Sequence, residues 1–105
     1  MKGDYIGEFE ELVMLLVGIL GETAYGLAIV DQLKEQANRT ATIGAVHATL
    51  ARLEKKGFLK SRLGGATKER GGRRKRIFEL TAHGKTALES SQVVRANLWK
   101  QYALK

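Results

Sequence analysis

The chain has 105 residues, two histidines and no cysteine, and its formal net charge is +7. This length allows one domain with a single core, and so small a core favours a dimer. The lack of cysteine excludes disulfide bonds, thiolate metal sites and cysteine nucleophiles, and two histidines are too few for a typical zinc site, so no cofactor is expected.

A first helix is predicted over residues 8–20, because its apolar residues recur at intervals of three and four. They are Phe9, Leu12, Val13, Leu16, Ile19 and Leu20. The apolar run is shorter than the ~20 residues of a membrane-spanning helix, and the acidic N-terminus differs from a secretory signal. We therefore expect a cytoplasmic protein that does not enter a membrane.

Two further helices are predicted over residues 25–37 and 43–56. Asn38 suits a left-handed stop after the second helix, while Thr42 and Gly57 suit the two ends of the third. In the third helix the inner face is predicted to carry Ile43, Val46, Leu50 and Leu53. The outer face is predicted to carry Ala45, Ala48, Thr49, Arg52, Lys55 and Lys56.

This pair of helices fits a helix-turn-helix, whose second helix enters the major groove of DNA. The residues predicted to read base edges are Thr42, Gly44, Ala45, Ala48 and Thr49, with Arg52 one turn further on. Small side chains allow a helix to approach the duplex closely. The alternative is an ordinary exposed helix face.

A β-hairpin is predicted from residues 58–63 and 76–81, which are joined by the glycine-rich sequence GGATKERGGRR. Residues 60–76 contain eight basic residues and one acid, and the rest of the chain is balanced in charge. Such a segment indicates a nucleic-acid partner. The residues predicted to contact phosphates or the minor groove are Arg70, Arg73, Arg74 and Lys75. The alternative is a solvated run of charge.

A last helix is predicted from residue 82 toward residue 104, with Thr81 as its cap. The fold class is therefore mainly α with a small β-hairpin: a winged helix-turn-helix DNA-binding domain in residues 1–81 and a C-terminal dimerisation helix in residues 82–105, forming one structural unit. Catalysis is not expected, because His83 is isolated and the acids Glu8, Glu10 and Glu11 suit the start of a helix.

Four consecutive stretches resemble the PadR (phenolic acid decarboxylase regulator) family of bacterial transcription factors. They are GEFEELVMLLVGIL, AYGLAIVDQL, TIGAVHATLARLEKKGFLKSRL and ERGGRRKRIFELTAHGKTAL. The resemblance implies a winged-helix homodimer located with the nucleoid, usually a repressor, that binds pseudo-palindromic double-stranded DNA operators and often releases them when a small ligand binds. It also implies that His47 occupies the place of a family tyrosine near the DNA backbone. His47 is interpreted either as a DNA contact or as a partly buried packing residue.

The short last helix resembles the compact subgroup of the family, in which it would serve dimerisation. The residues predicted at the dimer interface are Phe9, Leu12, Leu16, Leu98, Trp99 and Tyr102. Alternatively, Trp99 lines a pocket for a small aromatic effector between the subunits.

Two other functions fit the composition. The basic hairpin would also suit an RNA-binding or ribosome-associated module, although residues 60–76 contain no aromatic residue on which bases could stack. The third interpretation is a dimeric protein-interaction adaptor that does not bind DNA.

Overall fold

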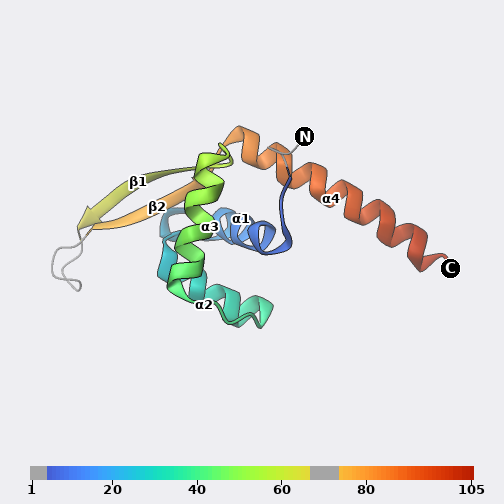
Figure 1. Cartoon of the computed structure of the whole chain (residues 1–105), viewed down its shortest axis with the longest axis horizontal. Coiled ribbons are helices and arrows are strands. Elements are labelled where there is room, and N and C mark those ends of the chain that lie inside the picture. Colours follow the sequence, from blue (N-terminus) through green and yellow to red (C-terminus); the bar gives the residue numbers. More distant parts are fainter. Residues whose placement is uncertain (1–4, 67–73) are drawn as a thin grey trace.

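The computed structural model describes residues 5–66 and 74–105, and Figure 1 shows their arrangement. The elements are α1 (Glu8–Leu20), a 3-10 turn (Gly21–Thr23), α2 (Gly26–Ala37), α3 (Ile43–Lys55), β1 (Leu59–Ala66), β2 (Arg74–Leu80) and α4 (Ala82–Ala103). This order confirms the predicted mainly α fold with a winged helix-turn-helix and a C-terminal helix. The hairpin and α4 project from opposite ends of the central helices, so that the molecule is elongated, 56 × 28 × 20 Å.

The predicted helix ends are confirmed by their backbone geometry. The Thr42 hydroxyl accepts a hydrogen bond from the N–H of Ala45 at 3.0 Å, which caps α3. Asn38 ends α2 in the left-handed conformation with φ 52°, and Gly57 follows α3 with φ 85°. The start and end of α3 are thus determined by residues adjacent to it in the sequence.

β1 and β2 form a two-stranded antiparallel sheet, in register from Leu59 opposite Leu80 to Leu63 opposite Arg76. Both strands extend further toward the connecting segment than the sequence predicted. Gly64 continues β1, and a Cβ atom on it would lie 3.2 Å from the Lys75 carbonyl oxygen. This glycine therefore allows close strand pairing, where we had expected only a loop.

The Thr81 hydroxyl joins the turn between α3 and β1 to α4 through two hydrogen bonds. It accepts from the N–H of Gly84 at 3.0 Å and donates to the carbonyl oxygen of Gly57 at 2.6 Å. The first half of α4 lies along α1, where Leu88 is buried, and the second half extends away from the rest of the chain. The cap at Thr81 therefore sets the direction in which α4 leaves the sheet.

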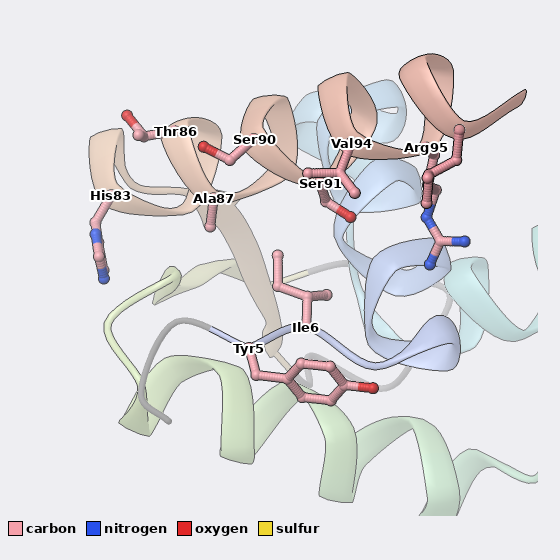
Figure 2. Close-up of a pocket in the computed structure, with 10 residues that line it drawn as sticks. Tyr5, Ile6, His83, Thr86, Ala87, Ser90, Ser91, Val94 and Arg95 are labelled. Carbon is pink, nitrogen blue, oxygen red and sulfur yellow. The ribbon is translucent and has the colours of Figure 1, made fainter. Parts of the chain in front are cut away.

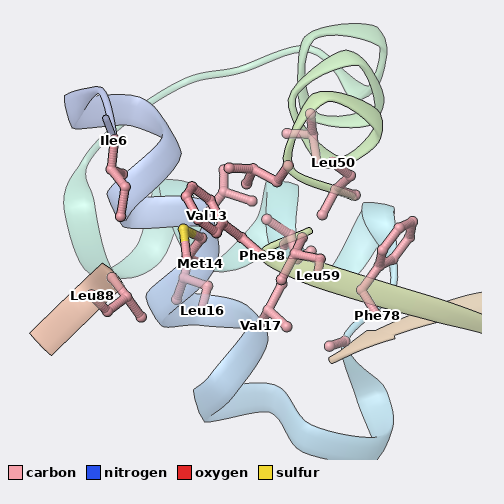
Figure 3. Packing of buried hydrophobic residues seen from close by; sticks show 14 of the residues in the cluster. Ile6, Val13, Met14, Leu16, Val17, Leu50, Phe58, Leu59, Phe78 and Leu88 are labelled. Atoms are coloured by element: carbon pink, nitrogen blue, oxygen red, sulfur yellow. The ribbon is translucent and has the colours of Figure 1, made fainter. Parts of the chain in front are cut away.

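The hydrophobic core lies between α1, α2, α3 and the hairpin, and Figure 3 shows part of it. Met14 of α1, Ile29 of α2, Leu50 of α3 and Phe58 before β1 are fully shielded from solvent. Burial of side chains of this size stabilises the fold by roughly 1.5–3 kcal/mol each. The core therefore holds the three helices of the helix-turn-helix and the base of the hairpin together.

Three acidic residues at the start of α1 each bind a different part of the fold. Glu8 pairs with Arg39 after α2, Glu10 with Arg52 and Lys56 of α3, and Glu11 with Gln92 and Arg95 of α4. The sequence explained these acids only through the helix macrodipole. In the structure they also connect α1 to the elements that surround it.

Candidate nucleic-acid interface

The outward face of α3 begins with small side chains. Thr42, Gly44, Ala45 and Ala48 are all exposed, whereas Val46 on the opposite side is fully buried. A backbone with so little covering it can approach a groove of a duplex closely. The structure therefore brings together four of the five residues predicted to read base edges, and their contact with DNA stays a prediction.

Thr49 is the exception, and its predicted position on the exposed face is wrong. The residue is only 3% exposed, and its hydroxyl accepts a hydrogen bond from Nη2 of Arg52 at 3.3 Å. Thr49 lies three residues after Val46 and four before Leu53, so it belongs to the same inner face as these two residues. It cannot read a base edge from there.

His47 lies where α3 meets the first turn of α2. It is exposed, and a Cβ atom built on Gly26 would lie 2.8 Å from Nε2 of its ring. The absence of a side chain at Gly26 therefore leaves room for the ring. The ring packs on α2, but its exposure does not fit a partly buried packing residue, and its contact with DNA stays a prediction.

Arg52 is bound to the protein itself. Its Nε donates to Oε2 of Glu10 at 2.9 Å, although its side chain is still half-exposed. Lys56 also binds Glu10, with Nζ 3.2 Å from both carboxylate oxygens. A role for Arg52 in DNA binding is therefore restricted to the part of the guanidinium group that faces solvent.

The pKa of Glu10 reflects two opposing effects. Burial raises it, but hydrogen bonds from the Gly7 N–H, Arg52 and Lys56 to the carboxylate outweigh burial and keep the pKa below its ordinary value of 4.5. Glu10 is therefore ionised at neutral pH and holds the C-terminal half of α3 against α1.

The basic hairpin is described only in part. Arg70 and Arg73 lie outside the described residues, and Arg74 begins β2 opposite Ala66. The ammonium group of Lys75 lies over the ring of Tyr25, 4.0 Å from its centroid. Lys75 is thus fixed by a contact that the sequence did not predict, and its contact with phosphate stays a prediction.

The predicted dimer residues of α1 differ in accessibility. Leu16 is only 6% exposed and belongs to the core, so its assignment to an intersubunit contact is wrong. Phe9 and Leu12 are half-buried against that core. Leu15 and Ile19, which the sequence analysis did not assign to the interface, are 38% and 64% exposed. Their spacing of four residues, on the side away from Val13 and Leu16, was the available signal.

The predicted dimer residues of α4 are all exposed. Leu98, Trp99 and Tyr102 are between 60% and 68% exposed, and the Trp99 and Tyr102 rings lie 5.5 Å apart. Val93 and Val94 are exposed on the same helix. The second half of α4 therefore presents apolar side chains to solvent on a helix that has left the core.

A groove of about 550 Å³ runs between α4 and the segment that precedes α1, and Figure 2 shows the residues that line it. Tyr5 and Ile6 form one side, and Ala87, Val94 and Leu98 contribute apolar surface on the other. Trp99 does not line this groove. Its predicted contact with an aromatic effector is therefore not provided by the groove within one chain.

No helix among the residues that the structure describes is both long enough and apolar enough to cross a lipid bilayer.

Comparison with known proteins gives a consistent result. Residues 15–90 match the transcriptional regulator PadR-like family. No curated protein matches the chain significantly in sequence. A PadR-like transcription factor from Bacteroides fragilis is 25% identical and superposes with a TM-score of 0.76, over 90% of this chain and 86% of that one.

Two other solved structures share the fold. A PadR family transcription regulator from Clostridium difficile R20291 is 26% identical with a TM-score of 0.69, over 89% of this chain and 95% of that one. PadR from Bacillus subtilis, solved in complex with operator DNA, is 20% identical with a TM-score of 0.66. This likeness covers 82% of the present chain and 47% of the Bacillus protein.

Proposed function

The chain belongs to the transcriptional regulator PadR-like family, and on that basis we propose that it is a homodimer that binds double-stranded DNA sequence-specifically and represses transcription. The observation that carries this proposal is the exposed row of small residues at the start of α3, beside His47. Side chains of this size let the helix axis approach base edges in the major groove. The Bacillus relative, which was solved with operator DNA, supports the same partner for this chain.

The two parts of the interface have different tasks in this proposal. The basic hairpin contributes affinity for the DNA backbone, which weakens steeply as salt rises because bound cations are released from the duplex. The start of α3 carries little charge and contributes discrimination between sequences. In a dimer, two copies of α3 would enter successive major grooves about 34 Å apart, which predicts a pseudo-palindromic operator.

Dimerisation is supported by the course of α4. Leu88 and Arg95, which face α1, lie on the same helical stripe as Trp99 and Tyr102. Tyr102 lies ~21 Å beyond Leu88 along the helix axis and is 68% exposed. A second copy would cover these aromatic rings. A planar aromatic effector bound beside Trp99 between the subunits would change their spacing and release the DNA.

The experiment that tests the proposal is selection of duplexes from a random library by the full chain. The selected duplex is then titrated by fluorescence anisotropy, and the complex is sized by sedimentation. We expect a palindromic site bound by two chains, and lower transcription of a reporter whose promoter contains that site. Failure to enrich any duplex, combined with tight binding of single-stranded RNA, would contradict the proposal and favour an RNA-binding module.

A further inference from the structure

We propose that Tyr25 is a positioning residue for the basic hairpin: its ring holds the ammonium group of Lys75 and so fixes the outer part of β2 relative to α2 and α3. This inference rests on the proposed DNA binding, since the hairpin must reach the duplex while α3 occupies the groove. The restraint that Tyr25 places on the hairpin is a property of the free protein, so it can be measured without DNA.

The contact joins two segments that are far apart in the sequence. Tyr25 is the residue before α2, in an extended conformation with φ −117° and ψ 165°, and Lys75 is the second residue of β2. Both residues are half-buried, and Nζ of Lys75 lies 4.0 Å from the centroid of the tyrosine ring. An ammonium group at this distance is attracted to the electron-rich face of the ring.

Two more contacts tie the same short segment to the hairpin. Arg62 of β1 forms an ion pair with Glu22 in the turn before α2. The N–H of Phe78 in β2 donates to the carbonyl oxygen of Ala24 at 2.9 Å. Residues 22–25 therefore hold both strands, and around these side chains lies a small hollow of about 260 Å³.

The positions of the three contacts differ along the strands, and this difference assigns Tyr25 its role. The Phe78 contact is near the core end of β2, and Arg62 of β1 stands opposite Ile77. Lys75 is the outermost of the three, since it lies three residues from Phe78 toward the segment between the strands. A two-stranded ribbon has little stability of its own, so its outer part needs a side-chain contact to stay in one orientation. Tyr25 provides that contact.

The arrangement does not remove Lys75 from DNA binding. An ammonium group has three N–H donors, and the tyrosine ring covers one side of it, so the other side can bind a phosphate oxygen. A hairpin that is already fixed also loses less conformational freedom when it meets the duplex, which favours affinity. Tyr25 would thus contribute to DNA binding through Lys75, without a contact of its own.

The first test uses the free, full-length protein and measures hydrogen exchange of backbone amides at residues 62–64 and 75–77. Loss of the ring in Tyr25→Leu should make these amides exchange about two- to fivefold faster, whereas Tyr25→Phe, which keeps the ring, should leave them unchanged. Tyr5→Leu removes a 70% exposed tyrosine from another part of the chain and serves as the matched control. Unchanged exchange in Tyr25→Leu would overturn the inference.

The second test measures affinity for the selected duplex at several salt concentrations. Tyr25→Leu should weaken binding about two- to fivefold with the same salt slope, because the number of charges is unchanged. Lys75→Met should weaken binding as well, and in addition it should lower the salt slope by about one. In the double variant the effect of Tyr25→Leu should vanish, since the tyrosine acts only through Lys75. Additive effects, or weaker binding by Tyr25→Phe, would contradict the inference and indicate a direct contact of the phenol with DNA.

These outcomes separate the inference from the function on which it rests. If the native chain binds no duplex, the proposed function fails, and hydrogen exchange alone decides whether Tyr25 fixes the hairpin. If Tyr25→Leu does not fold, Lys75→Met examines the same contact from the strand side: it should accelerate exchange at residues 62–64 as Tyr25→Leu would. Unchanged exchange in Lys75→Met would then overturn the inference.

Discussion

Gly84 of α4 packs directly against the backbone of Phe58: a Cβ atom on Gly84 would lie 2.1 Å from the Phe58 carbonyl oxygen. The obstacle is backbone, which cannot rotate away as a side chain can. Gly84→Ala should therefore force α4 away from β1 and lower the free energy of unfolding by about 3 kcal/mol, as overpacked cores do. Urea unfolding followed by circular dichroism measures this change.

Gly44→Ala is the matched control for that variant. Gly44 is exposed, and the nearest atom to an added Cβ, Oγ1 of Thr42, is 3.9 Å away. Replacement of a glycine within an unobstructed helix should stabilise the protein by roughly 0.5–1 kcal/mol. Equal effects of the two alanine substitutions would contradict the close packing of α4 against Phe58.

The fold could be predicted largely because its signals are local. The caps at Thr42 and Thr81 and the left-handed Asn38 lie next to the helices that they delimit. The apolar period of α1 predicted its bounds, Glu8–Leu20, to the residue. Family membership likewise confirms the prediction that the chain is a transcriptional regulator and no enzyme.

The site was less predictable, because it depends on which way a side chain faces and on contacts between distant residues. Thr49 was assigned to the outer face with Ala45 and Ala48, although its spacing from Val46 places it inside. Leu16 and Ile19 both fit the helical period, yet only Leu16 is in the core. The contact between Tyr25 and Lys75 joins residues 50 positions apart and has no local signal.

The stability of the protein should depend on pH through Glu10. Hydrogen bonds keep the pKa of this carboxyl below 4.5 in the folded protein, and in the unfolded chain it returns to its ordinary value. The stabilisation is therefore complete above about pH 4.5 and is lost as the pH falls through the lowered, folded-state pKa. Glu10→Gln should cost about 2 kcal/mol at pH 7, because Arg52 and Lys56 lose their charged partner.

Urea unfolding between pH 7 and pH 3 checks this prediction. The native chain should lose more stability over this range than Glu10→Gln, which has no proton to gain at this position. Glu8→Gln is a useful comparison, since Glu8 is exposed and pairs with Arg39 at 2.9 Å. Its effect should shrink with added salt, whereas that of Glu10→Gln should largely persist. Parallel pH profiles for the native chain and Glu10→Gln would contradict the assigned role.

Ala48 is exposed and Thr49 is buried. Substitution of Ala48 should therefore affect DNA recognition, and substitution of Thr49 should affect the stability of the protein. Ala48→Leu adds a bulky side chain to the exposed face of α3, and it should weaken binding to the selected duplex about tenfold, as much as a mismatched base pair. Thr49→Val removes a buried hydroxyl that binds Arg52, so it should change stability by about 1 kcal/mol and leave sequence preference unaltered.

Anisotropy titrations with the selected duplex and with single-base variants test both substitutions. The unfolding transition of each protein is measured in parallel. A change of preferred sequence in Thr49→Val, together with no effect of Ala48→Leu, would reverse the assignment of the two faces of α3.

Exposed apolar residues on α1 and α4 should determine the oligomeric state. Ile19 is 64% exposed and Trp99 68% exposed. We place Ile19 in the proposed interface together with Trp99, so that a charge at either position would be buried there without a partner, at a cost of several kcal/mol. Ile19→Asp and Trp99→Asp should therefore raise the dissociation constant of the dimer at least a hundredfold, as measured by sedimentation equilibrium. Leu27→Asp is the matched control, because Leu27 is likewise exposed, at 42%, but belongs to α2 and not to α1 or α4. It should leave the dimer intact, and dissociation by Leu27→Asp but not by Ile19→Asp would place the interface on α2.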